Sequence, residues 1–142
     1  MDRVQQALTE DGAFRDVTSP VVPNLRVRGV LLAKQDLVVA GLDCAAHAFR
    51  LMGVRCIPKF KDGGFAKKGS TLALVEGPAR RVLAAERTAL NFLQQLSGVA
   101  TLTRRFVGLA KPARIFDTRK TVPGLRDLQK RAVLSGGGHN HR

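Results

Sequence analysis

The sequence predicts an α+β fold in which an antiparallel sheet with helices is followed by the first strand and helix of a parallel β/α unit. Apolar and polar residues alternate over residues 25–34, and further short apolar runs bounded by turn residues continue to residue 77. Residues 78–96 lack glycine and are rich in good helix formers. Residues 113–116, a charged loop and an amphipathic stretch then follow in the order strand, loop, helix.

The first part of the chain is expected to form a single domain, since 142 residues with 44% hydrophobic composition can bury a core. A first helix ends near Gly12 and is followed by a turn at 16–20. Strands are expected at residues 25–34, 36–42, 54–60 and 70–77, the second being the more buried. A helix at 42–53 places His47 on its polar face, where a solvated histidine is the simplest interpretation.

The segment "KDGGFAKKG" at 61–69 has the glycine spacing of a phosphate-binding loop. Its lysines precede Gly69, however, whereas that motif needs a lysine after its last glycine. No long helix follows at once. We therefore interpret the segment as the turn of a hairpin.

The helix expected at 78–96 carries a polar stripe on an otherwise apolar surface: Arg87, Asn91 and Gln94. A solvated face is the simplest interpretation of this stripe. "SG" at 97–98 is expected to interrupt the helix, and a second helix is expected at 99–110.

The formal charge of +13, from 24 Lys and Arg against 11 Asp and Glu, indicates an anionic partner. Nucleic acid, a membrane surface and a phosphorylated small molecule all satisfy this condition. The chain has no Trp, no Tyr and seven Phe, so it offers few platforms on which single-stranded nucleic acid could stack. A nucleic-acid-binding module is kept as the alternative class.

Cys44 and Cys56 have no C-x-x-C spacing and no flanking histidine, which favours reduced, packed thiols over a zinc site or a disulfide. The longest apolar run is far below the roughly 18 residues of a membrane span, and no leader is visible at the N-terminus. These features favour a cytoplasmic protein that does not bind a membrane.

The C-terminal region is the most cationic, because residues 111–142 hold eight Lys and Arg and only two acids. Residues 113–116 are expected to form a strand that ends at Asp117, and residues 123–138 a helix with its apolar side inward. The loop "DTRKT" at 117–121 follows the strand, where ligand groups are expected in α/β barrels. A solvated loop is the alternative.

The chain ends in "SGGGHNHR", in which His139 and His141 could both ligate a metal. No cysteine or carboxylate lies within eight residues of them, which argues against a metal site.

Three segments in order, "ERTALNFLQQLSGVATLTRRFV", "DTRKTVPGLR" and "GGGHNHR", resemble quinolinate phosphoribosyltransferase, and the resemblance extends over nearly the whole chain. A related molybdenum-utilisation family shares the helix and a similar R-K-T-x-P-G segment, but "GGGHNHR" is more similar to the quinolinate enzyme. The glycine-rich stretch near the N-terminus departs from the family pattern and reads "EDGAFRD" here.

The resemblance implies an N-terminal α/β sandwich domain at residues 1–110 and, at 111–142, the first strand and helix of an α/β barrel. A barrel needs on the order of 250 residues, so we expect this portion alone to be incomplete and inactive. The resemblance also implies a homodimer with sites shared between subunits.

The implied reaction joins quinolinate and phosphoribosyl pyrophosphate to give nicotinate mononucleotide, pyrophosphate and CO₂, with Mg²⁺ as cofactor. The acidic groups that bind Mg²⁺ are expected in the missing half of the barrel. The resemblance assigns Arg119, His141 and Arg142 to the two substrate carboxylates. It assigns Lys120 to a catalytic position between the two substrates, and Arg87 to the neighbouring subunit's site.

Overall fold

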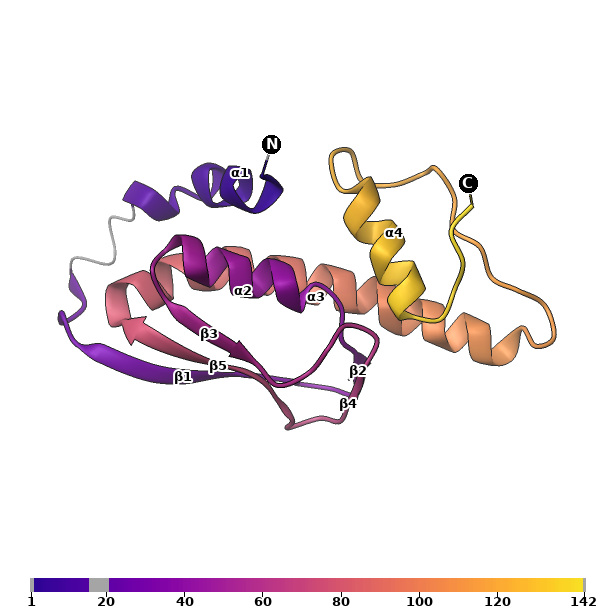
Figure 1. Cartoon of the computed structure of the whole chain (residues 1–142), viewed down its shortest axis with the longest axis horizontal. Helices are drawn as coiled ribbons and strands as arrows, with labels where there is room; N and C mark the ends of the chain where they lie inside the picture. The colour runs from indigo at the N-terminus through magenta and orange to yellow at the C-terminus, as the bar shows by residue number, and fades with distance from the viewer. Residues whose placement is uncertain (1, 16–20, 142) are drawn as a thin grey trace.

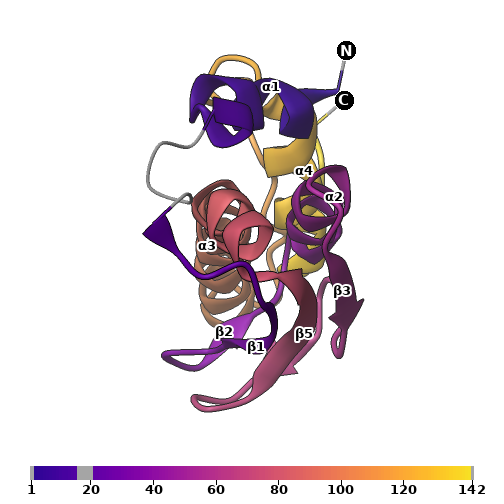
Figure 2. The same cartoon turned by 90° about the vertical axis from the view of Figure 1, so that its left-hand side faces the viewer.

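The computed structural model describes residues 2–15 and 21–141, in which helices cover one face of a small antiparallel sheet (Figures 1 and 2). The elements are α1 (Arg3–Glu10), η1 (Ala13–Arg15), β1 (Arg26–Leu32), β2 (Leu37–Val38), α2 (Leu42–Leu51), β3 (Arg55–Pro58), β4 (Phe65–Ala66), β5 (Thr71–Pro78), α3 (Ala79–Leu109) and α4 (Arg126–Ser135). In Figure 2, α2 and α3 lie against the sheet, and α1 lies beyond them. The turn predicted at 16–20 and the end of the "EDGAFRD" stretch fall outside the described residues.

The main sheet has the strand order β1-β5-β3, and both pairs are antiparallel, as predicted. In the central strand β5, Leu72, Ala73 and Val75 are buried. Along β1 the exposed and less exposed residues alternate, and Leu31 is buried. This pattern is that of a sheet with one face packed and the other facing solvent.

The predicted strand at 36–42 is wrong in length, because only Leu37–Val38 pairs with another strand, β4. Side chains of α3 take the place of a longer strand partner. The Val38 amide donates to Thr101 Oγ1 at 2.9 Å, and Ser97 Oγ lies 3.1 Å from both the amide and the carbonyl of Ala40. The chain is therefore buried here without extended pairing.

The segment 61–69 connects the antiparallel strands β3 and β5, which confirms the hairpin interpretation. It is longer than a tight turn because it contains β4. Gly63 and Gly69 have φ of +88° and +86°, a conformation that residues with a Cβ rarely adopt.

The predicted break at 97–98 is wrong, because α3 runs without interruption through Ser97 and Gly98. Ser97 is buried and its hydroxyl bonds to Ala40 across the interface, so it does not compete with the helix backbone. A glycine in a helix costs about 1 kcal/mol relative to alanine. The long buried face of α3 offsets that cost: Ala85, Ala89, Phe92, Leu93, Leu96 and Ala100.

Helix α4 packs against the second half of α3 and lies within the predicted range, burying Leu128 and Ala132 (Figure 1). A Cβ on Gly136 would lie 2.5 Å from the Ala100 carbonyl oxygen, so only glycine fits where α4 ends. Arg104 Nε of α3 donates to the Gly136 carbonyl at 3.0 Å. These contacts fix the start of the segment that leads to the end of the chain.

The strand predicted at 113–116 is reduced to one parallel bridge between Phe116 and His139. Parallel strands of a β/α unit normally pair on both edges. Among the described residues only the segment after α4 pairs with this one, so no regular strand forms.

Within the described part of the chain, no helix is both long and apolar enough to cross a membrane.

Candidate active site

The loop at 117–121 precedes α4 in the sequence and the segment at 139–141 follows it, and the two meet where Asp117 lies beside His139. The His139 amide donates to the Ile115 carbonyl at 2.8 Å, and the Asp117 amide donates to the His139 carbonyl at 2.9 Å. The two segments run parallel and are joined through α4, which is the predicted β/α arrangement. Residues that follow parallel strands emerge at the same edge, where open α/β sheets bind ligands.

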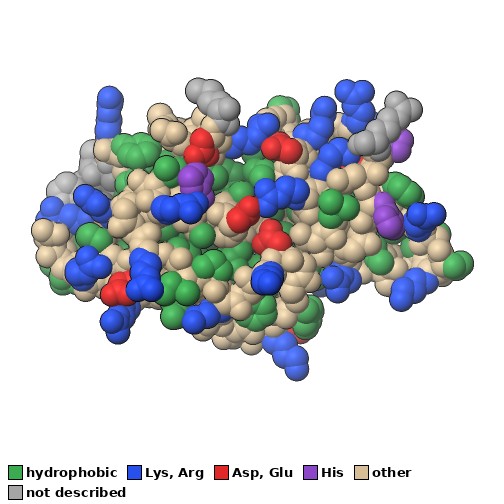
Figure 3. All heavy atoms as spheres, viewed as in Figure 1, with side chains coloured by type: hydrophobic (Ala, Val, Ile, Leu, Met, Phe, Trp, Pro, Cys, Tyr) green, Lys and Arg blue, Asp and Glu red, His purple; other side chains and the backbone are tan. Residues whose placement is uncertain are grey.

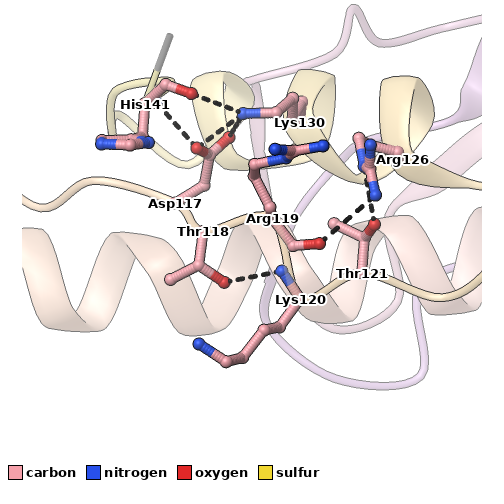
Figure 4. Close-up of polar contacts among 8 residues, drawn as sticks. All are labelled: Asp117, Thr118, Arg119, Lys120, Thr121, Arg126, Lys130 and His141. Carbon is pink, nitrogen blue, oxygen red and sulfur yellow. Dashed lines mark hydrogen bonds and ion pairs between the residues drawn. The ribbon is translucent and has the colours of Figure 1, made fainter.

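Asp117 connects these two segments to α4 (Figure 4). Its side chain is 6% exposed and accepts hydrogen bonds from Lys130 Nζ at 2.7 and 2.8 Å and from the His141 amide at 2.7 Å. With its amide nitrogen turned toward Asp117, Asn140 donates to Oδ2 at 2.8 Å and to the Lys130 carbonyl at 3.0 Å. Both carboxylate oxygens thus have two donors.

Burial raises the pKa of the Asp117 carboxyl, but the hydrogen bonds from Lys130 and the His141 amide outweigh it and leave that pKa below its usual range. Asp117 is therefore a stable carboxylate at neutral pH. Lys130, whose side chain is 16% exposed, supplies its compensating charge.

Arg119 and Lys120 are exposed on the loop, and their side chains extend to different sides of it (Figure 4). The loop backbone is held by Thr118 Oγ1, which accepts from the Lys120 amide at 3.1 Å, and by Arg126, which donates to Thr121 Oγ1 at 3.2 Å. Among the described residues, neither side chain forms an ion pair or a side-chain hydrogen bond. Both cations are therefore available to an anion.

The two histidines lie in different surroundings. Both are exposed, but the His139 ring packs on Phe116 with centroids 5.3 Å apart, whereas the His141 backbone is fixed by Asp117 and Lys130. In the described ranges, no group of three or more His, Cys, Asp or Glu side chains is placed to hold a metal ion.

Arg87 is not brought to this edge within the chain. It projects from α3 with a side chain that is 73% exposed, and its Nη1 lies 2.9 Å from Asp11 Oδ1 at the end of α1. At 1.5 Å per residue, Arg87 lies about 20 Å along α3 from Ala100, where the end of α4 packs. Asn91 and Gln94 are also exposed. Arg142 lies outside the described residues.

The surface around this edge is strongly cationic. On the face shown in Figure 3, Lys and Arg side chains clearly outnumber acidic ones, also over α4 and the end of the chain. Clustered cations of this kind raise the local concentration of anionic ligands.

Sequence reasoning missed Asp117 as the central residue of the site and did not select Lys130 at all. One signal was present, because Asp117 is one of two acids in the region with eight cations. An acid at a strand end in such a region is expected to be paired, and a lysine near the inward face of the following helix is a natural partner.

The fold is an antiparallel sheet covered by helices and followed by one β/α unit, and exposed cations lie at the edge of that unit. The family model described as quinolinate phosphoribosyl transferase, N-terminal domain, matches residues 16–97, and the one for the C-terminal domain matches residues 99–142. Together they cover nearly the whole sequence. The chain belongs to the quinolinate phosphoribosyl transferase family.

Several relatives carry the same enzyme name. The chain is 43% identical to the chloroplastic nicotinate-nucleotide pyrophosphorylase (carboxylating) of Arabidopsis thaliana over 98% of its own length and 41% of the relative's. It is 42% identical to the probable enzyme of that name from Methanocaldococcus jannaschii, with coverage of 98% and 50%.

Solved structures agree with the fold. The nicotinate-nucleotide pyrophosphorylase from Francisella tularensis matches with a TM-score of 0.93 and 34% identity over 98% of this chain and 52% of that one. The corresponding protein from Ehrlichia chaffeensis matches with a TM-score of 0.91 and 36% identity, covering 98% and 53%. The chain thus spans about half the length of the relatives it matches.

Proposed function

We propose that this chain supplies part of the site that transfers a phosphoribosyl group from phosphoribosyl pyrophosphate to quinolinate, with loss of CO₂. The observation that carries the proposal is that Arg119 and Lys120 are exposed and form no ion pair with the described residues, on a loop whose first residue, Asp117, binds the His141 amide. The family to which the chain belongs and the names of its relatives support the same reaction.

The chemistry of quinolinate fits these side chains. Its two adjacent carboxylates suit the planar fork of arginine, which binds a carboxylate through two parallel hydrogen bonds. Arg119 would bind one carboxylate, and Arg142 and His141 would complete the dicarboxylate site. Lys120, on the other side of the loop, would lie between quinolinate and the pyrophosphate group of the second substrate.

In the proposed reaction the pyridine nitrogen forms a bond to the anomeric carbon while the bond from that carbon to pyrophosphate breaks. Positive charge develops on the ribose, and positioned groups can supply much of the catalysis. The quaternised ring then accepts the electron pair of the bond to the adjacent carboxylate. CO₂ leaves, and a proton takes its place on the ring carbon. No nucleophile of the chain is required.

The cation Mg²⁺ prefers several oxygen ligands, including one or two carboxylates. The described residues do not fit it, since they provide no acidic cluster and Asp117 is already occupied by Lys130. No step of the proposal passes through Mg²⁺ bound to these residues.

We extend the proposal to a cytoplasmic homodimer in which Arg87 acts in the partner's site. The side chain of Arg87, which is 73% exposed, supports action across an interface. Sedimentation at rising protein concentration tests the dimer, and a persistent monomer would contradict it.

Binding of quinolinate to the 142-residue chain tests the proposed function. Quinolinate or its analogue phthalate should raise the melting temperature. Replacing Arg119→Ala should weaken binding by roughly 2 to 5 kcal/mol. The matched control is Arg114→Ala, which removes the same charge from an exposed residue before the loop and should bind as the wild type does.

Two outcomes would contradict this function. The melting temperature could be insensitive to quinolinate, or Arg114→Ala could weaken binding as much as Arg119→Ala. RNA binding that weakens steeply with salt and ignores quinolinate would favour the nucleic-acid-binding alternative.

A further inference from the structure

We propose that Asp117 is a positioning residue that sets the distance between the Arg119 loop and the His141 segment, and that Lys130 keeps Asp117 from pairing with the substrate-binding cations. The relevance of this role to quinolinate rests on the proposed function. The geometric role itself does not.

The first argument is the chain geometry around the carboxylate. Asp117 stands two residues before Arg119, and the same carboxylate accepts directly from the backbone amide of His141 at 2.7 Å. Asn140 provides a second bond from the same segment. Both substrate-facing segments are thus fixed within two residues of one buried group.

The second argument is the pattern of donors. Among the described residues, every group that hydrogen-bonds to the Asp117 carboxylate is an N–H donor, so the site needs an acceptor on both side-chain oxygens. An ionised carboxylate meets this need, because it is acceptor-only. Asparagine would turn its NH₂ group either toward Lys130 and the His141 amide or toward Lys130 and Asn140, so in each orientation the 139–141 segment would lose one of its bonds to this side chain.

The third argument concerns charge. Buried ion pairs add little net stability compared with apolar packing, so this pair needs a reason beyond stability. An unpaired carboxylate next to Arg119 would attract its guanidinium and compete with the substrate. Lys130 forms two short contacts with Asp117 and satisfies it from the α4 side, which leaves Arg119 free.

The proposal is tested by NMR on the 142-residue chain with Asp117→Asn and Lys130→Met. The matched control is Asp127→Asn, which removes the same charge from α4 but from an exposed ion pair with Arg3. One readout is the hydrogen-exchange rate of the His141 amide, together with nuclear Overhauser contacts between residues 118–119 and 140–141. The other readout is the dissociation constant of quinolinate.

In Asp117→Asn, the His141 amide should exchange about ten- to a hundredfold faster, the range that loss of a hydrogen bond to a charged group produces. The cross-segment contacts should disappear while amides in α2 and α3 keep their protection. Quinolinate should bind at least about tenfold more weakly. Lys130→Met should also weaken quinolinate binding, whereas Lys130→Arg, which keeps the charge, should retain most of the wild-type affinity. Asp127→Asn should change neither readout.

Unchanged exchange and contacts at residues 140–141 in Asp117→Asn would overturn the proposal. Lost contacts with unchanged quinolinate affinity would also overturn it, since Asp117 would then only support the fold. If the wild-type chain does not bind quinolinate but the contacts depend on Asp117 as expected, the geometric role stands and the proposed function fails. If Asp117→Asn does not fold, the proposal is tested with Lys130→Met, by the exchange rate of the His141 amide, the cross-segment contacts and the affinity for quinolinate.

Discussion

Three aspartates each hold one helix to another part of the molecule. The pairs are Asp2 with His47, Asp43 with Arg131, and Asp117 with Lys130. In each case the pKa of the carboxyl lies below its ordinary value. The hydrogen bond from His47 is the main cause at Asp2, whereas at Asp43 burial raises the pKa and the Arg131 contacts outweigh it.

These lowered pKa values predict how stability depends on acidity. A carboxyl group with a lower pKa in the folded state stabilises the fold above its unfolded pKa, which is about 3.9 for aspartate, and loses this contribution as pH falls through the folded pKa. The free energy of unfolding should therefore fall as pH drops below about 4. Denaturant unfolding at pH 7, 5, 4 and 3 measures this.

The same measurement on Asp43→Asn should give a weaker dependence on pH, because the Arg131 contact no longer changes with protonation. Glu86→Gln, which removes an exposed carboxylate of α3, should keep the wild-type slope. An equal slope in wild type and Asp43→Asn would show that this contact does not contribute.

At the scale of elements, α3 organises the domain through side chains that replace a strand partner. The Ser97 hydroxyl accepts from the buried Ala40 amide and donates to the Ala40 carbonyl. Ser97→Ala should therefore lower the free energy of unfolding by about 1 to 3 kcal/mol, the cost of leaving a buried backbone donor unpaired. Urea unfolding measures the change.

The neighbouring glycine provides the control. A Cβ on Gly98 would meet nothing within 4 Å, so Gly98→Ala should raise stability by about 1 kcal/mol through helix propensity alone. Opposite signs at adjacent positions would establish that Ser97 acts through Ala40. A neutral Ser97→Ala would contradict this account.

The spacing of apolar residues along the chain predicted the elements that bury one regular face, such as β1, α2 and α4. They failed where the deciding partner is distant in the sequence. Ser97 looks like a helix breaker, but its partner Ala40 lies 57 positions away. The strand predicted at 36–42 is shorter in the structure for the same reason, because distant side chains of α3 bind its backbone. A hydroxyl that binds across an interface cannot be distinguished by local pattern from one that ends a helix.

At the scale of the whole molecule, the proposed function gives this chain the cationic part of a site and little of its acidic part. It spans about half the length of its relatives, and its described residues hold no acidic cluster. We therefore predict that the purified 142-residue chain binds quinolinate but does not convert it. Chromatographic assay for nicotinate mononucleotide checks this, and product formation would show the prediction to be wrong.

The sequence resemblance identified individual site residues but not their framework. Arg119, Lys120 and His141 were selected because they lie in the segments that resemble the family. The structure places the segments that carry these three residues at one β/α edge. Asp117 and Lys130 were missed because their contacts join positions 13 and 24 apart. Whether the selected residues bind quinolinate stays a prediction.

The continuity of α3 also bears on how this protein can be divided. The two family models meet between residues 97 and 99, in the interior of a helix 31 residues long. A cut at that boundary would split the hydrogen-bonded ladder of α3 and separate Ser97 from Ala100, which contacts the end of α4. The sheet and the candidate site are thus carried on one continuous helix, which runs without interruption through the point where the two sequence modules join.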